Sequence, residues 1–168
     1  ELVPGQTFRI ARESLFEQIQ EAQAQGYAVK PVIPGPLTWL YQGKGDAFAA
    51  GAADAGKLQL LAALLPVYEE VLARFARLGV QWVQIDEPIL ALDLPQAWRV
   101  AFKQTYDQLS ASPVKLLVAT YFDGLKDNLP TALSLPVAGL HVDLVRAPEQ
   151  LAQVVSGLGA DQVLSAGV

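Results

Sequence analysis

The stretch QWVQIDEP, residues 81–88, ends an apolar run in two adjacent carboxylates and a proline. A long helical pattern closed by Gly79 precedes it, and another helical pattern begins near Pro95. This order is typical of a buried strand in a parallel α/β fold, whose strands deliver their last polar residues to the face where substrates bind. Asp86 and Glu87 are therefore candidate functional residues. The structural alternative is that Glu87 caps or salt-bridges a neighbouring loop.

Strand and helix patterns alternate along the rest of the chain. Short apolar runs predict five strands, at residues 27–33, 82–86, 114–120, 140–145 and 163–168, and residues 8–10 could form a further short one. Apolar residues at helical spacing predict helices at residues 13–25, 37–41, 57–78, 95–109, 125–133 and 149–158. Pro66 lies inside the third pattern and is expected to kink it or to start a second helix. Residues 43–56, rich in Gly and Ala, are expected to form a mobile loop.

The strand patterns predict the fold class. Four of them are continuous apolar runs without two-residue alternation, as expected for a parallel sheet buried on both faces. An open doubly wound sheet would normally carry a glycine fingerprint for phosphate at its first turn, and this chain has none. We therefore predict an α/β fold of the (β/α)₈ barrel type. Such barrels run to about 250 residues, so residues 1–168 are expected to form one partial barrel domain of about five units, cut at both ends.

Composition excludes several classes of protein. Hydrophobic residues make up 52% of the chain and charged residues 17%, which indicates a globular domain with a substantial core. No apolar run approaches the roughly 20 residues of a membrane helix, and no signal peptide is visible. We therefore expect a cytoplasmic protein with no membrane partner. The net charge of −5 and the scattered Lys and Arg residues argue against binding to nucleic acid.

The residue types also limit the chemistry of the chain. It contains no cysteine and a single histidine, His141, so it cannot by itself supply a thiolate or polyhistidine zinc site. His141 lies in an apolar strand pattern and is interpreted as a hydrogen-bonded core residue rather than a ligand. No acidic cluster has the spacing of a magnesium site, and neither a P-loop nor a nucleophile elbow is present. We expect no metal and no cofactor in this chain.

Six ordered blocks of the sequence resemble cobalamin-independent methionine synthase, specifically its amino-terminal barrel. The blocks are KPVIPGPLTWL (30–40), LLPVY (64–68), WVQIDEP (82–88) continuing through LPQAW (94–98), VATYF (118–122), GLHVDLV (139–145) and LSAG (164–167). The resemblance implies a parent protein that transfers a methyl group from 5-methyltetrahydrofolate polyglutamate to homocysteine, giving methionine. It also implies two face-to-face barrels that look like duplicated copies, with zinc held by one His, two Cys and a Glu in the carboxy-terminal copy.

Comparison with that catalytic copy indicates what this chain lacks. Residues 120–122 occupy the place of its His-x-Cys ligands, and Asp143 occupies the place of its ligating Glu. Asp86 is retained where the catalytic half touches homocysteine. The resemblance therefore implies a non-catalytic copy that braces the carboxy-terminal barrel of the same parent chain. No catalytic residue is expected here, and the candidates for substrate contact are the strand-end residues Asp86, Glu87, Thr120 and Asp143.

Three alternatives or additions stay open. A stand-alone barrel enzyme could use Asp86 and Glu87 as acid and base, although adjacent strand residues point to opposite faces. A folate-tail or small-anion binding module would need clustered cations at strand ends, where only Lys30 and Arg146 are available. Finally, a partial barrel leaves two unpaired sheet edges and an uncovered face, so self-association is expected.

Overall fold

A single parallel sheet organises the computed structural model, which describes residues 1–46, 48 and 54–168. Its five strands within these residues are β1 (Val32–Pro34), β2 (Trp82–Asp86), β3 (Lys115–Ala119), β4 (Gly139–Asp143) and β5 (Val163–Gly167). They lie side by side in the order β1-β2-β3-β4-β5, and every neighbouring pair is parallel. Sequential parallel order means that each connection steps to the next strand in one direction, as the chain does in a (β/α)₈ barrel.

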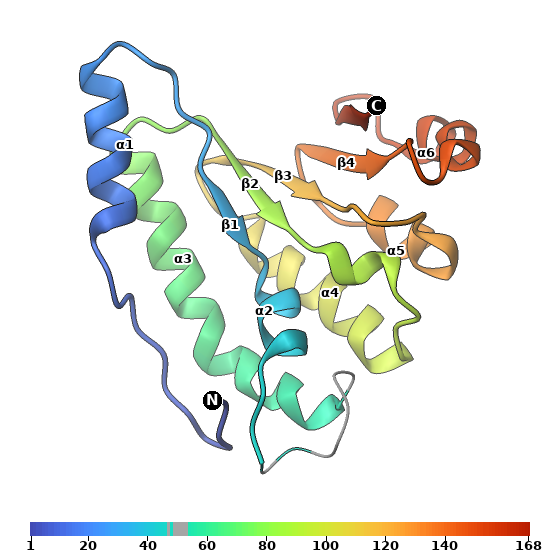
Figure 1. Ribbon diagram of the computed structural model, residues 1–168, viewed down its shortest axis with the longest axis horizontal. Helices are drawn as coiled ribbons and strands as arrows, with labels where there is room; N and C mark the ends of the chain where they lie inside the picture. The colour runs from blue at the N-terminus through green and yellow to red at the C-terminus, as the bar shows by residue number, and fades with distance from the viewer. Residues whose placement is uncertain (47, 49–53) are drawn as a thin grey trace.

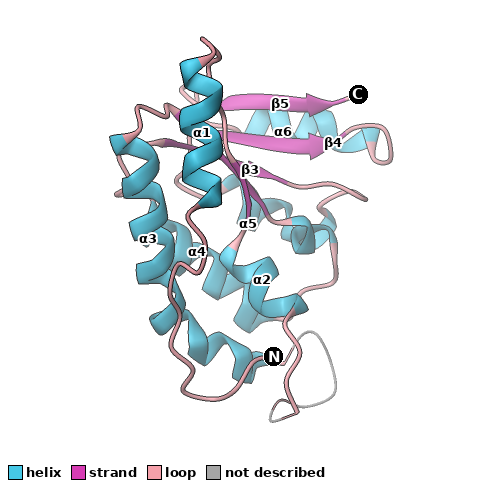
Figure 2. Cartoon of the chain, turned by 60° about the vertical axis from the view of Figure 1, so that its left-hand side comes forward, coloured by secondary structure: helices cyan, strands magenta, loops and turns pink. Residues whose placement is uncertain are grey.

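Helices connect the strands (Figure 1). They are α1 (Ser14–Ala24), α2 (Pro36–Gln42), α3 (Leu61–Arg77), α4 (Gln96–Leu109), α5 (Leu129–Leu133) and α6 (Leu151–Gly157), with 3₁₀ turns η1 (Ala55–Leu60), η2 (Pro88–Ala91), η3 (Lys126–Asn128) and η4 (Pro148–Gln150). Helices α3 to α6 cover one face of the sheet, and α1 packs beside α3 through the Phe16–Phe75 ring contact. Figure 2 shows α3 and α4 side by side and α6 behind β4 and β5. The predicted α/β fold, a partial (β/α)₈ barrel, is confirmed.

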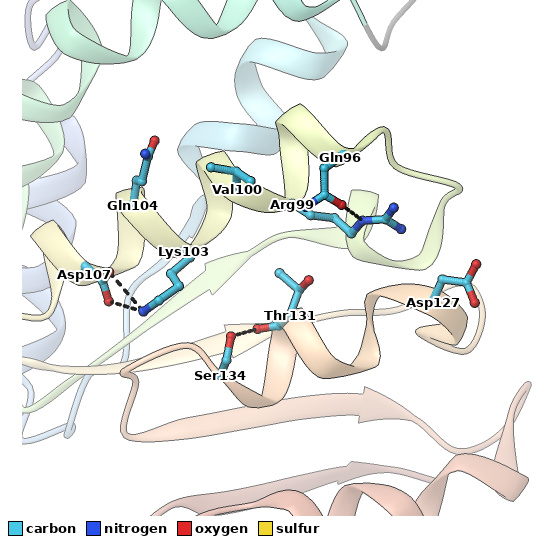
Figure 3. A pocket seen from close by; sticks show the side chains of 9 residues that line it. All are labelled: Gln96, Arg99, Val100, Lys103, Gln104, Asp107, Asp127, Thr131 and Ser134. Atoms are coloured by element: carbon cyan, nitrogen blue, oxygen red, sulfur yellow. Dashed lines mark hydrogen bonds and ion pairs between the residues drawn. The ribbon is translucent and has the colours of Figure 1, made fainter.

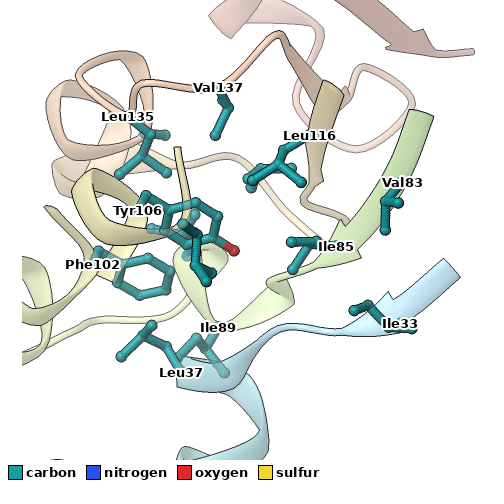
Figure 4. Close-up of a cluster of buried hydrophobic side chains, with 14 of the residues drawn as sticks. Ile33, Leu37, Val83, Ile85, Ile89, Phe102, Tyr106, Leu116, Leu135 and Val137 are labelled. Atoms are coloured by element: carbon teal, nitrogen blue, oxygen red, sulfur yellow. The ribbon is translucent and has the colours of Figure 1, made fainter. Parts of the chain in front are cut away.

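The hydrophobic core fills the space between the sheet and the helices. Val83 and Ile85 of β2 are fully buried, and so are Phe102 and Tyr106 of α4, which face them across this space (Figure 4). Burial of such large side chains is the main favourable contribution to folding, at about 25 cal/mol for each Å² of apolar surface removed from water. The face of the sheet that carries Val83 and Ile85 is therefore the one that packs against the helices in the core.

The opposite face of the sheet, called here the inner face, is only partly covered. The register aligns Gln84 of β2 with Val32 on β1, and Gly139 of β4 with Val163 on β5. Val32 and Val163 are 50% and 49% exposed. The prediction of a sheet buried on both faces holds for the central strands, where Leu117 and Ala119 of β3 and Gly139 of β4 are buried on the inner face as well. It is wrong at the edge strands β1 and β5, whose inner-face valines no further strand covers.

The structure shifts several predicted elements. β1 begins at Val32 rather than at residue 27, since Pro31 has no N–H to donate and takes part only through its carbonyl, which accepts from the Gln84 N–H. Residues 8–10 form no strand. α3 starts at Leu61 and runs through Pro66, so no second helix begins there. Pro66 and Ala62 are both exposed, and water can satisfy the carbonyl that the proline leaves without a donor.

Part of the predicted mobile loop at residues 43–56 lies outside the described residues. In the described ranges no helix is both long and apolar enough to cross a membrane.

Candidate functional site

Asp86, the last residue of β2, and Glu87, the residue after it, point to opposite faces of the sheet. Glu87 is completely buried on the helix side, whereas Asp86 is half-buried on the inner face. Alternation of side chains along a strand accounts for this separation. One substrate cannot contact both groups, so the arrangement does not provide the acid–base pair that a stand-alone enzyme would need.

Glu87 holds the start of α2. Its carboxylate accepts hydrogen bonds from the backbone N–H groups of Leu37 (3.3 Å) and Thr38 (2.8 Å) and from the Tyr106 hydroxyl (3.1 Å). Burial raises the pKa of Glu87 to about 7, although the hydrogen bonds from Thr38, Tyr106 and Leu37 act in the opposite direction. Burial also raises the pKa of Tyr106 well above its usual value, so this hydroxyl remains a donor. The prediction that Glu87 caps a neighbouring segment is therefore the one that the geometry supports.

A polar network follows the inner face of β2. The Lys30 ammonium donates to Gln84 Oε1 at 2.8 Å, and Gln84 Nε2 donates to Asp86 Oδ1 at 2.8 Å. The Tyr121 hydroxyl donates to Asp86 Oδ2 at 3.0 Å. Burial, with the hydrogen bond to Asp86, raises the pKa of Tyr121 to about 12. Asp86 thus lies in an ordered array of donors on the face where a barrel would place its interior.

His141 lies on the same inner face, two strands away from Asp86. The register places the small Ala119 between them, so their backbones are about 10 Å apart at the usual strand spacing. His141 Nδ1 and Ser165 Oγ are 2.9 Å apart. Burial lowers the pKa of His141 and the positive charge of Lys30 lowers it further, against the opposing effect of Asp143 and Asp86. His141 is hydrogen-bonded as expected, but it is partly exposed rather than part of the helix-side core.

Thr120 and Asp143, the other two predicted residues, hold backbone at the ends of β3 and β4. Thr120 is completely buried, and its hydroxyl donates to the His141 carbonyl at 2.8 Å. Asp143 accepts from the backbone N–H groups of Phe122, Val145 and Arg146.

The loops that Asp143 joins carry exposed side chains. Phe122 has a φ of +83° and is 67% exposed, and such a left-handed conformation is costly for a bulky residue. The hydrogen bond from the Arg146 backbone, together with the other donors, holds the pKa of Asp143 below its usual value. Arg146 also bonds Asp143 through its guanidinium at 3.3 Å, so this cation has a carboxylate partner.

Sequence reasoning missed three members of the inner-face network, namely Gln84, Tyr121 and Ser165. The two-residue period of a strand links Gln84 to the face of Asp86 and could have identified it. Tyr121 and Ser165 reach their partners only through the strand register, which the sequence does not reveal.

The donor groups do not fit the zinc site that the resemblance implies for the parent. The sequence has no cysteine and one histidine, and a catalytic zinc site needs three protein ligands. Across the described part of the chain, no group of three His, Cys, Asp or Glu side chains lies close enough to hold a metal ion. The residues of this inner face therefore act through hydrogen bonds and charge rather than as zinc ligands.

Fold and site together define a partial (β/α)₈ barrel domain with a polar inner face and strand-end groups that hold its loops. Within that class, the chain belongs to the family described as "Cobalamin-independent synthase, N-terminal domain", which matches residues 1–168. The family resemblance seen in the sequence is thereby confirmed.

A solved structure shares this fold. It is described as a "methyltransferase from Methanosarcina mazei" and superposes with a TM-score of 0.66 at 15% sequence identity. The match covers 90% of this chain and 47% of that chain, so the present chain spans about half the length of this solved relative. At this identity the likeness shows the fold alone.

Proposed function

We propose that this chain is a piece of the N-terminal, non-zinc barrel of a cobalamin-independent methionine synthase. The parent would transfer a methyl group from 5-methyltetrahydrofolate polyglutamate to homocysteine. In this proposal the piece braces the carboxy-terminal catalytic barrel of the same parent and is inactive alone. The family membership supports a parent of this kind, and the fold shared with a methyltransferase agrees with it.

One observation carries the bracing role. Three of the four strand-end polar residues use their side chains to hold backbone: Glu87 at α2, Thr120 at β4 and Asp143 at two loops. Because these side chains already bond the backbone, they stabilise the carboxyl edge of the barrel and are not available for a reaction. Asp86 differs, because its partners are side chains on the inner face.

Zinc and the homocysteine thiol are assigned, in this proposal, to the carboxy-terminal barrel. Bound zinc would supply a deprotonated thiol as the nucleophile. The residues described here offer neither thiolates nor a second imidazole for that purpose.

A methyl-transfer assay tests the proposal. The chain alone, supplied with zinc, homocysteine and the folate triglutamate, is expected to make no methionine. In the full-length parent, Asp86→Asn is expected to leave kcat unchanged. Gln84→Glu, a change of similar size on the same face, serves as the matched variant and is expected to behave in the same way. Methionine formed by the chain alone, or a loss of kcat in the Asp86 variant without loss of folded protein, would overturn the bracing role.

A folate-tail or small-anion module is less well supported. Arg146 is bonded to Asp143, which leaves Lys30 as the candidate cation of the pair. Lys30 donates to the neutral Gln84 amide and forms no ion pair within 4.0 Å in the described ranges. Calorimetric titration with folate triglutamate discriminates the bracing role from the folate-tail module. Micromolar binding by the wild-type chain that is lost in Lys30→Gln would favour the module.

A further inference from the structure

Two exposed apolar side chains adjoin each other at the carboxyl edge of the sheet. Phe122 follows β3 and is 67% exposed, and Val145 follows β4 and is 70% exposed. Among the large apolar residues that the structure describes, only Val168, at the last position, is more exposed. Phe122 and Val145 are called here the edge patch. A single exposed apolar residue is normal on a protein surface, whereas adjoining ones indicate a site of contact.

One carboxylate holds both members of the edge patch. Asp143 is buried, and its Oδ2 accepts from the Phe122 N–H at 3.1 Å while its Oδ1 accepts from the Val145 N–H at 3.1 Å. The Tyr121 ring packs edge-on against the Phe122 ring, with centroids 4.7 Å apart. The Tyr121 hydroxyl is in turn bonded to Asp86. The edge patch is therefore ordered before a partner binds, which lowers the entropic cost of binding.

The backbone of Phe122 is strained. Its φ of +83° lies in the left-handed region, which is unfavourable for a bulky side chain and favourable for glycine. The hydrogen bond to Asp143 helps to keep this conformation. An exposed ring contributes little to the fold through its own burial, so the fold does not explain why phenylalanine stands here. Strain of this kind is concentrated at functional sites, and a contact between the ring and a partner accounts for it.

Further strands of a barrel would not cover the edge patch. β3 and β4 are already paired on both sides, in the order β2-β3-β4-β5 (Figure 1). Additional strands can therefore join the sheet only at β1 and β5. Phe122 and Val145 lie beyond the carboxyl ends of the two central strands, so a partner reaches them from outside that edge.

Val100 on the helical layer provides a contrast. It is 44% exposed and lines a hollow of about 570 Å³ between α4 and α5 (Figure 3). The rest of that lining is polar or charged, and Lys103 pairs there with Asp107 at 3.1 Å. Val100 is a regular residue of α4. Its exposure involves neither a strained backbone nor an apolar neighbour in the hollow, so it indicates no partner.

We propose that the edge patch is a contact surface for the carboxy-terminal half of the same parent chain. This inference rests on the proposed function and names the residues through which the bracing acts. The family is described as an N-terminal domain, and the match covers 47% of the solved methyltransferase, so that relative has a second part of comparable length. A partner of this size is available without any second protein.

Arg146 indicates the chemistry of the partner surface. Its side chain is 60% exposed beside the edge patch, and Asp143 orients its guanidinium at 3.3 Å. Aromatic residues and arginine are enriched at the centres of protein interfaces. The partner surface should therefore present apolar side chains to Phe122 and Val145, with a carbonyl or carboxylate acceptor for the remaining donors of Arg146.

Photo-cross-linking of the full-length parent tests the proposal. In Phe122→p-benzoylphenylalanine and Val145→p-benzoylphenylalanine we expect cross-links to peptides of the carboxy-terminal half, identified by mass spectrometry. Tyr27→p-benzoylphenylalanine is the matched control, because Tyr27 is 65% exposed but precedes β1, at the opposite edge of the sheet. It should give no such cross-link, and Val100→p-benzoylphenylalanine should give none either.

Asp143→Asn separates the two members of the edge patch. The Asp143 Oδ1 atom accepts from the N–H groups of Val145 and Arg146, and an asparagine oxygen can replace it. The amide nitrogen cannot accept from the Phe122 N–H. We therefore expect Asp143→Asn to reduce the cross-link yield at position 122 and to leave the yield at position 145 unchanged.

Phe122→Gly separates contact from folding. Glycine suits the left-handed backbone, so the thermal unfolding midpoint of the chain alone should not fall. The midpoint of the parent should fall, because the contact with the carboxy-terminal half is lost. A midpoint that falls equally in both proteins would show that the ring acts within the fold, and would overturn the proposal.

Three cross-linking results would also overturn it: cross-links from position 122 that stay within the N-terminal half, cross-links between two copies of the parent, or equal yields from positions 122 and 27. The proposed function fails separately. A parent that makes methionine without the cross-link refutes the edge patch alone, whereas methionine formed by the chain alone refutes the bracing role.

Discussion

The Glu87 carboxylate accepts a hydrogen bond of 2.8 Å from the backbone N–H of Thr38, in the first turn of α2. Gly35, the N-cap residue of this helix, has no side chain that could accept the bond. A carboxylate that directly follows β2 therefore performs the capping that a Ser or Asp at position 35 would normally provide. The helix that follows β1 is in this way joined to the end of β2.

Gly35 should not tolerate even a methyl group. A Cβ at this position would overlap the Cδ and Oε1 atoms of Glu87, which cannot move in a fully buried site. We expect Gly35→Ala to lower the free energy of unfolding by about 3 kcal/mol, in the upper range for an overpacked core. Urea denaturation measures the change. Gly159→Ala is the control, because position 159 is exposed and its added Cβ would meet only the flexible Gln162 side chain. Equal stability of the two variants would contradict the proposed contact.

Glu87 should make stability depend on pH in an unusual direction. Its pKa is raised to about 7 from an ordinary value of 4.5, so between these limits the folded state binds more protons than the unfolded state. Its contribution to stability is therefore fully present below pH 4.5 and is lost as the pH rises through about 7. The rise in the pKa of Glu87 from 4.5 to about 7, at about 1.4 kcal/mol for each pKa unit, corresponds to a change of about 3 kcal/mol in the free energy of unfolding.

The comparison with Glu87→Gln isolates this effect, since every other titrating group is shared. Between pH 5 and pH 8 the wild-type free energy of unfolding should fall relative to that of the variant, as measured by urea denaturation at each pH. A difference that stays constant over this range would show that the carboxylate is ionised throughout. A difference of opposite sign would show that its pKa is lowered by the cap.

Sequence patterns predicted the alternation of strands and helices because helices show apolar residues at helical spacing, whereas buried strands show short continuous apolar runs. The apolar run before Asp86 and the glycine at position 79 located β2 correctly. Contacts between distant segments were not accessible in this way. The short helix predicted at residues 37–41 begins one residue earlier, since Pro36 is the first residue of α2, as proline's fixed φ allows. What makes that start stable is Glu87, 49 residues beyond Thr38. The functions of Thr120 and Asp143 depend on strand register in the same manner.

His141 reports on the charges of the inner face. It is the chain's only histidine, so its ring protons give a single set of NMR titration signals. Burial and the Lys30 charge both lower its pKa, and Lys30→Gln removes the second effect. We expect the pKa of His141 to lie below 6.5 in the wild type and to rise in Lys30→Gln. Asp86→Asn should lower it, because that carboxylate stabilises the protonated ring. Lys103→Gln, on the outer surface of α4, should leave it unchanged; an equal response to both lysine variants would contradict the placement of Lys30.

The partly covered inner face is expected to drive self-association of the chain. Val32 and Val163 expose about half of their surface there, at 50% and 49%, and they lie on the edge strands β1 and β5. An unpaired edge beside exposed apolar side chains favours pairing with a second copy. Sedimentation velocity should therefore show association that increases with concentration. The double variant Val32→Lys and Val163→Lys should weaken it at least about tenfold through like-charge repulsion. Val100→Lys on α4 is the control, since Val100 is similarly exposed at 44% but lies on the helical layer. A wild-type chain that stays monomeric at high concentration, or a control variant that dissociates equally, would rule out the inner face as the surface of association.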